Sequence, residues 1–154
     1  MLKKGFTPLD TKHLMGFTLL EVLIVVIIIG ILAAIALPQY TNTIERSKAG
    51  EAMANIGALR QSVDRYWYQN SELSDVSLPP YGGGDTNLDV SNPNKQEKRL
   101  YDYTFANDGT DATTRKYTIK ATRTIDTNTY VEWVQANNES GQFYKSSNLG
   151  GPTP

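Results

Sequence analysis

The chain has 154 residues, and its fifteen Lys and Arg nearly balance its sixteen Asp and Glu. The lack of a basic surplus gives no indication of a nucleic-acid partner. The lack of Cys excludes disulfides and thiolate metal sites. The length suits one ordinary domain once an apolar N-terminal segment is set aside.

Residues 1–16 form a short basic leader with three Lys and one Asp. Positive charge on one flank of an apolar segment favours the cytoplasmic side of a membrane. We therefore expect the leader in the cytoplasm and the residues after Pro38 outside the inner membrane.

The segment 17–37 is the only stretch of the chain that could span a membrane. Its sixteen residues from Val22 to Leu37 carry no polar side chain. Its twenty-one residues would make a helix roughly 31 Å long, about the thickness of the hydrocarbon core. Glu21 lies near its start, where lipid offers no partner, so this carboxylate is a functional hypothesis.

These residues resemble the processing site and N-terminal helix of a type IV pilin or a type II secretion pseudopilin. The similarity rests on the Gly16-Phe17 junction, on Glu21 as the fifth residue from Phe17, and on an apolar helix followed by Leu37-Pro38-Gln39-Tyr40. It implies that a prepilin peptidase cleaves between Gly16 and Phe17 and that the new Phe17 amine is methylated. It also implies that inner-membrane machinery assembles the mature chain into a helical filament, in which Glu21 serves subunit assembly.

Two other interpretations of the apolar segment remain. One is a secretory signal peptide, since Ala34-Ile35-Ala36 fits a small-residue cleavage site. The other is a plain membrane anchor. Neither explains a Glu four residues after the Gly16-Phe17 junction, or a helical pattern that continues past Pro38.

Gly30 and Pro38 are the candidate helix breaks. Gly weakens a helix by about 1 kcal/mol relative to Ala, and Pro removes a backbone hydrogen bond. They predict either a simple kink or, as similar pilins imply, unwinding of residues 30–38 when the subunit leaves the lipid.

From Gln39 to Gln69 the sequence predicts that the same helix continues and becomes amphipathic. Apolar side chains recur every three or four residues and so share one helix face. We expect a sheet of the same chain to cover this stripe, which consists of Ala49, Ala52, Ile56, Leu59, Val63 and Tyr66.

Residues 70–154 are expected to form the globular head. The stretch 70–99 is rich in Pro and Gly and predicts an irregular loop. Residues 100–145 show period-two alternation, and the short gaps favour antiparallel pairing. The expected strands are 100–106, 116–124, 129–135 and a short fourth at 142–145.

Turns are expected where Asn, Asp and Gly gather, at Asn107-Asp108-Gly109, Asp126-Thr127-Asn128 and Asn137-Asn138. The tail 146–154 is rich in Gly and Pro and is expected to be loose. Because pilins commonly carry a disulfide near the C-terminus, this segment of a Cys-free chain must be held differently.

No catalytic constellation is found, since the only His, His13, lies in the leader. Asp108-Gly109-Thr110-Asp111 suggests calcium, but a hairpin turn explains it better. Asn138-Glu139-Ser140 matches a glycosylation acceptor, although a turn is again the simpler use. We expect no enzyme activity, no cofactor and no metal.

The sequence thus predicts an α+β subunit in which a long N-terminal helix packs on a three- or four-stranded antiparallel sheet. The expected function is a structural subunit of a type IV pilus-like filament, anchored in the inner membrane before assembly and then extracellular or periplasmic. Its expected partners are other copies of the chain, the prepilin peptidase and the assembly machinery; nucleic acid is undetermined. The alternatives are a major pseudopilin of type II secretion and, in another class, an exported binding module.

Overall fold

The computed structural model describes residues 16–109 and 114–153. The chain divides into two compact units between Tyr40 and Thr41, and each is described by itself. One helix contributes to both units, and strands follow it in the second. In order the elements are α1 (Leu19–Asn70), η1 (Pro93–Lys95), β1 (Tyr101–Asn107), β2 (Tyr117–Arg123), β3 (Asp126–Gln135), β4 (Gly141–Lys145) and η2 (Ser147–Leu149).

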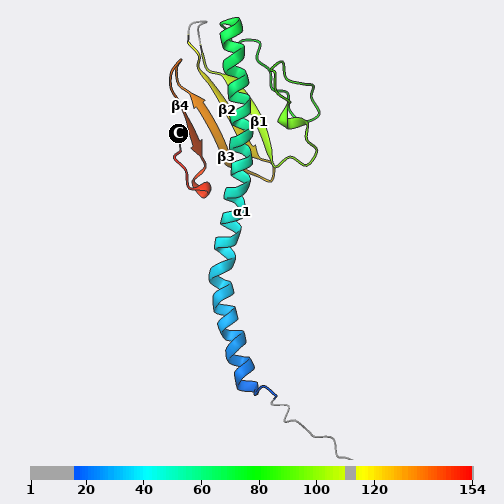
Figure 1. Ribbon diagram of the computed structural model, residues 1–154, viewed down its shortest axis with the longest axis vertical. Coiled ribbons are helices and arrows are strands. Elements are labelled where there is room, and N and C mark those ends of the chain that lie inside the picture. The colour runs from blue at the N-terminus through cyan, green and yellow to red at the C-terminus, as the bar shows by residue number, and fades with distance from the viewer. Residues whose placement is uncertain (1–15, 110–113, 154) are drawn as a thin grey trace, which may run out of the picture. The chain divides into compact units, whose positions relative to one another are not determined.

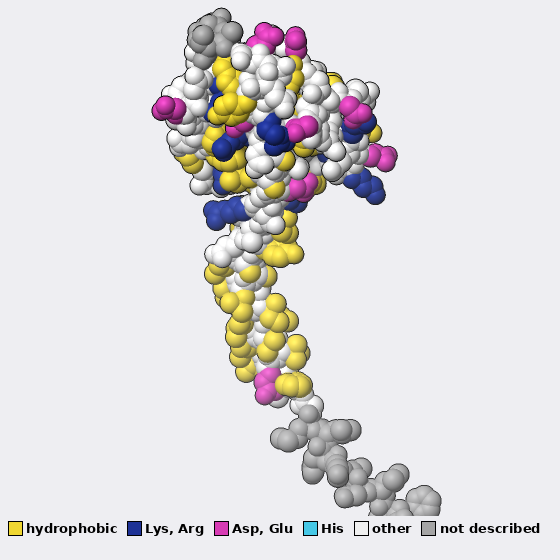
Figure 2. All heavy atoms as spheres, turned by 45° about the horizontal axis from the view of Figure 1, so that its top comes forward, with side chains coloured by type: hydrophobic (Ala, Val, Ile, Leu, Met, Phe, Trp, Pro, Cys, Tyr) yellow, Lys and Arg dark blue, Asp and Glu magenta, His cyan; other side chains and the backbone are white. Residues whose placement is uncertain are grey.

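The first unit consists of the apolar part of α1. Every large apolar side chain from Val22 to Leu37 is between 48% and 64% exposed, and Figure 2 shows such side chains covering this stretch of the helix. Within the described residues, α1 alone is long and apolar enough to cross a membrane. The described residues of the chain leave this surface uncovered.

The candidate break residues Gly30 and Pro38 lie within α1, which runs without interruption from Leu19 to Asn70, and a kink at these residues stays a prediction. A helix tolerates one missing donor when the remaining backbone bonds of the adjoining turns are kept. That residues 30–38 unwind outside the lipid therefore stays a prediction.

The second unit contains an antiparallel sheet with strand order β1-β2-β3-β4 (Figure 1). Each strand pairs with the next one in sequence, through registers such as Tyr103↔Ala121, Ala121↔Val131 and Trp133↔Phe143. The prediction of a helix on a four-stranded antiparallel sheet is confirmed.

The core lies between α1 and one face of this sheet. Five members of the predicted helix stripe are buried: Ala49, Ala52, Ile56, Leu59 and Val63. They pack with the alternate side chains of the strands, among them Tyr103, Tyr117, Ile119, Val131 and Trp133. Because each fully buried Ile, Leu or Val contributes about 1.5–3 kcal/mol, this interface supplies much of the head's stability.

The turn between β2 and β3 differs from the prediction. It falls at Thr124 and Ile125, and the expected turn residue Asp126 begins β3. The pairing register shifts beyond Thr122, and the Asp126 carboxylate accepts bonds from the Asn128 N–H and the Thr129 hydroxyl. The expected turn residues Asp126-Thr127-Asn128 therefore lie in the first part of β3, next to the shift in pairing register.

The C-terminal segment is packed, where a loose tail was expected. Leu149 is buried in η2, and the Lys145 N–H donates to the Pro152 carbonyl at 2.9 Å. Ser146 donates its N–H to the Tyr130 carbonyl at 3.0 Å, and Gly150 has φ +70°, which lets the chain turn back. Backbone bonds thus hold the segment without a disulfide.

Residues 71–99 cross the surface with little regular structure apart from η1, and one buried amide anchors them to the sheet. The Asn94 side chain accepts from the Tyr103 N–H at 2.7 Å and donates to the Tyr103 carbonyl at 2.8 Å. It also donates to the Pro79 carbonyl at 2.9 Å. Asn94 therefore takes the place of a neighbouring strand at the edge of β1.

Candidate assembly site

The start of α1 is held by a reciprocal pair of side chains. Thr18 precedes the helix, and its hydroxyl accepts from the Glu21 N–H at 3.3 Å. The Glu21 carboxylate in turn accepts from the Thr18 N–H and the Thr18 hydroxyl, both at 2.8 Å. This is a capping box, which satisfies backbone donors that the first turn of a helix leaves free.

Glu21 was expected to find no partner in lipid, and Thr18 as a partner within the chain was not anticipated. The Glu21 carboxylate has donors from its own chain, and it lies in the first turn of α1, where the helix dipole favours an anion. The sequence carried the signal, since Thr18-Leu19-Leu20-Glu21 matches the capping-box spacing before an apolar run.

Gly16 and Phe17 precede the helix and are exposed. Phe17 is 85% exposed, and Gly16 has no heavy atom near the position of a Cβ. The structure therefore brings Gly16, Phe17, Thr18 and Glu21 together in one short accessible stretch. Gly30 and Pro38 lie farther along the same helix, as its interior members.

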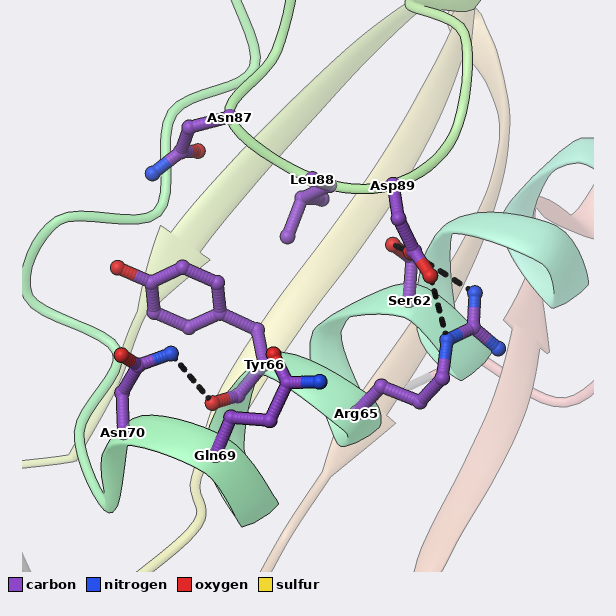
Figure 3. Close-up of a pocket in the computed structure, with 8 residues that line it drawn as sticks. All are labelled: Ser62, Arg65, Tyr66, Gln69, Asn70, Asn87, Leu88 and Asp89. Atoms are coloured by element: carbon purple, nitrogen blue, oxygen red, sulfur yellow. Dashed lines mark hydrogen bonds and ion pairs between the residues drawn. The ribbon is translucent and has the colours of Figure 1, made fainter.

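A small polar pocket lies between the last turns of α1 and the loop that follows (Figure 3). Its volume is about 190 Å³, below the roughly 300–1,000 Å³ of typical small-molecule sites. Arg65 donates to Asp89 at 2.7 and 2.8 Å, and the Ser62 hydroxyl donates to the same carboxylate. These bonds, chiefly that of Arg65, lower the pKa of Asp89 to about 2. They also fasten the loop that carries Asp89 to the helix.

A buried polar network joins the same part of α1 to β2. The Tyr117 hydroxyl donates to Asp64 at 2.8 Å, and the Arg115 guanidinium lies 3.2 Å from that carboxylate. Burial, together with the Asp64 carboxylate, raises the pKa of Tyr117 well above its usual value. Sequence reasoning missed this network, because Asp64 and Tyr117 are far apart in the chain.

The candidate glycosylation triplet belongs to this network. The Asn138 side chain accepts from the Arg115 N–H and its carbonyl accepts from the Arg115 guanidinium, both at 2.5 Å. Asn138 thus holds a turn, which is the simpler of its two expected uses. The candidate calcium segment lies partly outside the described residues, and within the described ranges no three acidic or His side chains group to hold a metal.

Comparison with known proteins places these features in a family. Residues 16–37 match the model of the prokaryotic N-terminal methylation motif. Residues 38–142 match the model described as type IV minor pilin ComP, DNA uptake sequence receptor. The type IV major fimbrial protein FimA of Dichelobacter nodosus is 35% identical over 122 residues, which cover 71% of this chain and 74% of that protein. The chain belongs to the type IV pilin family.

Other relatives match a smaller share of this pilin's sequence. A fimbrial protein of Pseudomonas aeruginosa is 39% identical over 49% of this chain and 46% of its own length. The type IV major pilin PilE1 of Neisseria gonorrhoeae is 38% identical over 42% of this chain and 43% of its own length. No solved structure gives a significant match.

Proposed function

We propose that this pilin is a structural subunit of an extracellular type IV pilus, built from many copies of the chain. The observation that carries the proposal is the apolar half of α1, whose large side chains from Val22 to Leu37 are all about half exposed or more. Such a surface is unstable in water. A bilayer covers it before assembly, and equivalent helices of other subunits cover it in the filament.

The processing step fits the accessible stretch before α1. The prepilin peptidase cleaves between Gly16 and Phe17 on the cytoplasmic side, and the Phe17 amine is then methylated. Removal of residues 1–16 takes away three of the fifteen cationic side chains. The residues after Pro38 lie outside the inner membrane, in the orientation that the basic leader favours.

Glu21 sets the register between subunits in this proposal. An isolated charge in hydrocarbon is expensive, and a partner of opposite charge lowers that penalty. The capping bonds from Thr18 hold the Glu21 carboxylate at the helix start in the free subunit. In the filament Glu21 of an incoming chain pairs with the Phe17 amine of the chain added before it.

Electron microscopy of material sheared from cells tests this function, with an antibody against residues 70–154 as the label. Long labelled fibres are expected on the cell surface. Short structures confined to the periplasm would instead favour the pseudopilus of a type II secretion system. N-terminal sequencing that finds mature chains beginning at Leu37 would favour an exported binding module and contradict the proposal.

A second candidate function is DNA uptake, favoured by the match of residues 38–142 to the minor-pilin model described as a DNA uptake sequence receptor. The charges of this chain argue for the structural role instead. Residues 17–154 hold twelve cationic against fifteen acidic side chains, and eight of those cations already form ion pairs.

Binding of a DNA duplex to purified filaments, measured over a range of salt concentrations, separates the two roles. A receptor that contacts several phosphates loses affinity steeply as salt rises. We expect no binding beyond that of a control filament; specific, strongly salt-dependent binding would favour DNA uptake.

A further inference from the structure

The second unit, Thr41–Pro154, has two ends along α1, and its contacts define them. The Tyr117 hydroxyl bonds to Asp64, so the first residue of β2 lies beside the late part of the helix. The Arg123 guanidinium lies 3.2 Å from Glu45, so the last residue of β2 lies beside the early part. The turn between β2 and β3 and the C-terminal segment therefore share the early end, whereas the loop after α1 shares the late end.

The late end is acidic. We call it the acidic end, and it is defined by four exposed carboxylates: Glu72, Asp75, Asp108 and Glu139. Of the exposed cations described there, Lys116 alone has no carboxylate partner among the residues that the structure describes. The last turn of α1 contains no basic residue, although the C-terminal end of a helix favours a cation. The helix dipole and the carboxylates thus add to one another, and Figure 2, which is turned toward this end, shows carboxylates projecting from it.

The early end is basic. We call it the basic end, and it is defined by four cations: Arg46, Lys48, Arg123 and Lys145. Glu45 is shared there between Lys48 and Arg123 at 2.7 and 3.2 Å, and Asp102, opposite Thr122 in the sheet, is paired with Arg99 at 2.5 Å. Arg46 and Lys145 have no carboxylate partner within the described residues, and they lie beside Gly150 and Gly151 of the packed tail. Asp126 is also exposed here, but the cations outnumber the carboxylates.

We propose that the acidic end of one subunit docks against the basic end of another copy of the same chain in the filament. This inference rests on the proposed function, because a polymer of helices that all point the same way brings unlike ends together. Such a contact joins two different surfaces and repeats without closing, which generates a helical fibre. Opposite charges at the two ends favour this orientation, and like charges repel an inverted subunit.

Charge reversal in full-length chains tests the docking. One variant carries Glu72→Lys and Asp75→Lys, a second carries Arg46→Glu and Lys145→Glu, and a third carries all four changes. We expect each double variant to give about tenfold less filament, since it replaces two attractive contacts by repulsive ones. The fourfold variant should recover most of the wild-type yield, because its ends are again complementary.

Two controls separate docking from folding. Glu97→Lys reverses an exposed carboxylate outside both sets and should give wild-type yield. Lys at positions 72 and 75 suits the end of a helix dipole, so the acidic-end variant should be at least as resistant to proteolysis in the membrane as the wild type. A loss of filament in that variant therefore cannot come from unfolding.

Salt supplies a second readout. Because exposed charges are screened over about 10 Å at 0.1 M and about 3 Å at 1 M ionic strength, high salt should weaken wild-type filaments and relieve the repulsion in the double variants. Double variants that assemble like the wild type would overturn the inference, as would a fourfold variant that is stable but gives no more filament than the doubles. A wild type that makes no filament would instead overturn the proposed function itself.

Discussion

Replacement of Asn94 by Ala should cost the head a large share of its stability. Asn94 is 1% exposed, and its amide bonds both backbone groups of Tyr103 together with the Pro79 carbonyl. The substitution leaves the Tyr103 N–H and carbonyl without these partners, whereas the Pro79 carbonyl keeps a bond from the Asn92 side chain at 3.0 Å. Each buried unpaired group costs about 1–3 kcal/mol. We therefore expect the free energy of unfolding to fall by about 2–5 kcal/mol, chiefly because the N–H and carbonyl of Tyr103 lose their partners.

Thermal unfolding of the second unit, residues 41–154, measures this loss. One kcal/mol shifts the midpoint of a domain of this size by roughly 4 °C, so Asn94→Ala should unfold about 8–20 °C below the wild type. Gln69→Ala is the matched control, because Gln69 is an exposed amide, and it should change the midpoint by less than about 3 °C.

Asn94→Asp sharpens the same test. The carboxylate can accept from the Tyr103 N–H, but it cannot donate to the Tyr103 and Pro79 carbonyls, to which the Asn94 amide donates. Burial beside these acceptors should raise the pKa of the new carboxyl, so the variant should gain stability relative to the wild type as the pH falls below that pKa. If Asn94→Ala unfolds at the same temperature as Gln69→Ala, the assigned role of the amide in fastening the loop to β1 is wrong.

Four further predictions follow from the two units. Gly16→Val should leave the uncleaved precursor in the membrane, and mass spectrometry showing a chain that begins at Phe17 would contradict the assigned junction. Glu21→Gln should be cleaved normally but give little filament; normal yield would rule out the charge pair with the Phe17 amine. The folded-state pKa of Asp89 lies at about 2, below the ordinary 3.8, so the stability that it provides is present above pH 4 and lost as the pH falls toward 2. Asp89→Asn should therefore flatten acid unfolding in that window, and an unchanged acid profile would show that this carboxylate is unimportant. Ile56→Ala should lower the unfolding free energy of the head by about 2–5 kcal/mol, measured by denaturant, and a loss under 1 kcal/mol would mean that the helix stripe is not the core.

The sequence by itself determined the features that depend on local pattern. The apolar run, Glu21 and the Gly16-Phe17 junction indicated the family and a helix long and apolar enough to cross a membrane. Periods of three to four residues and of two residues predicted the helix stripe and the antiparallel strands, because these periods decide which side chains share a face. The capping box of Thr18 and Glu21 was equally local and could have been predicted from its spacing.

Only the tertiary structure decided the features that join distant residues. The sequence around Asn94 did not indicate that its amide would take the place of a strand beside Tyr103. The sequence around Asp64 did not indicate that its carboxylate would accept a bond from Tyr117 across the core. The composition of residues 146–154 indicated a loose tail, but the carbonyl of Pro152 lies within reach of β4 once the chain turns back at Gly150. Hydrogen-bond partners separated by many residues are set by packing of the helix on the sheet, and no local pattern encodes which polar groups that packing brings together.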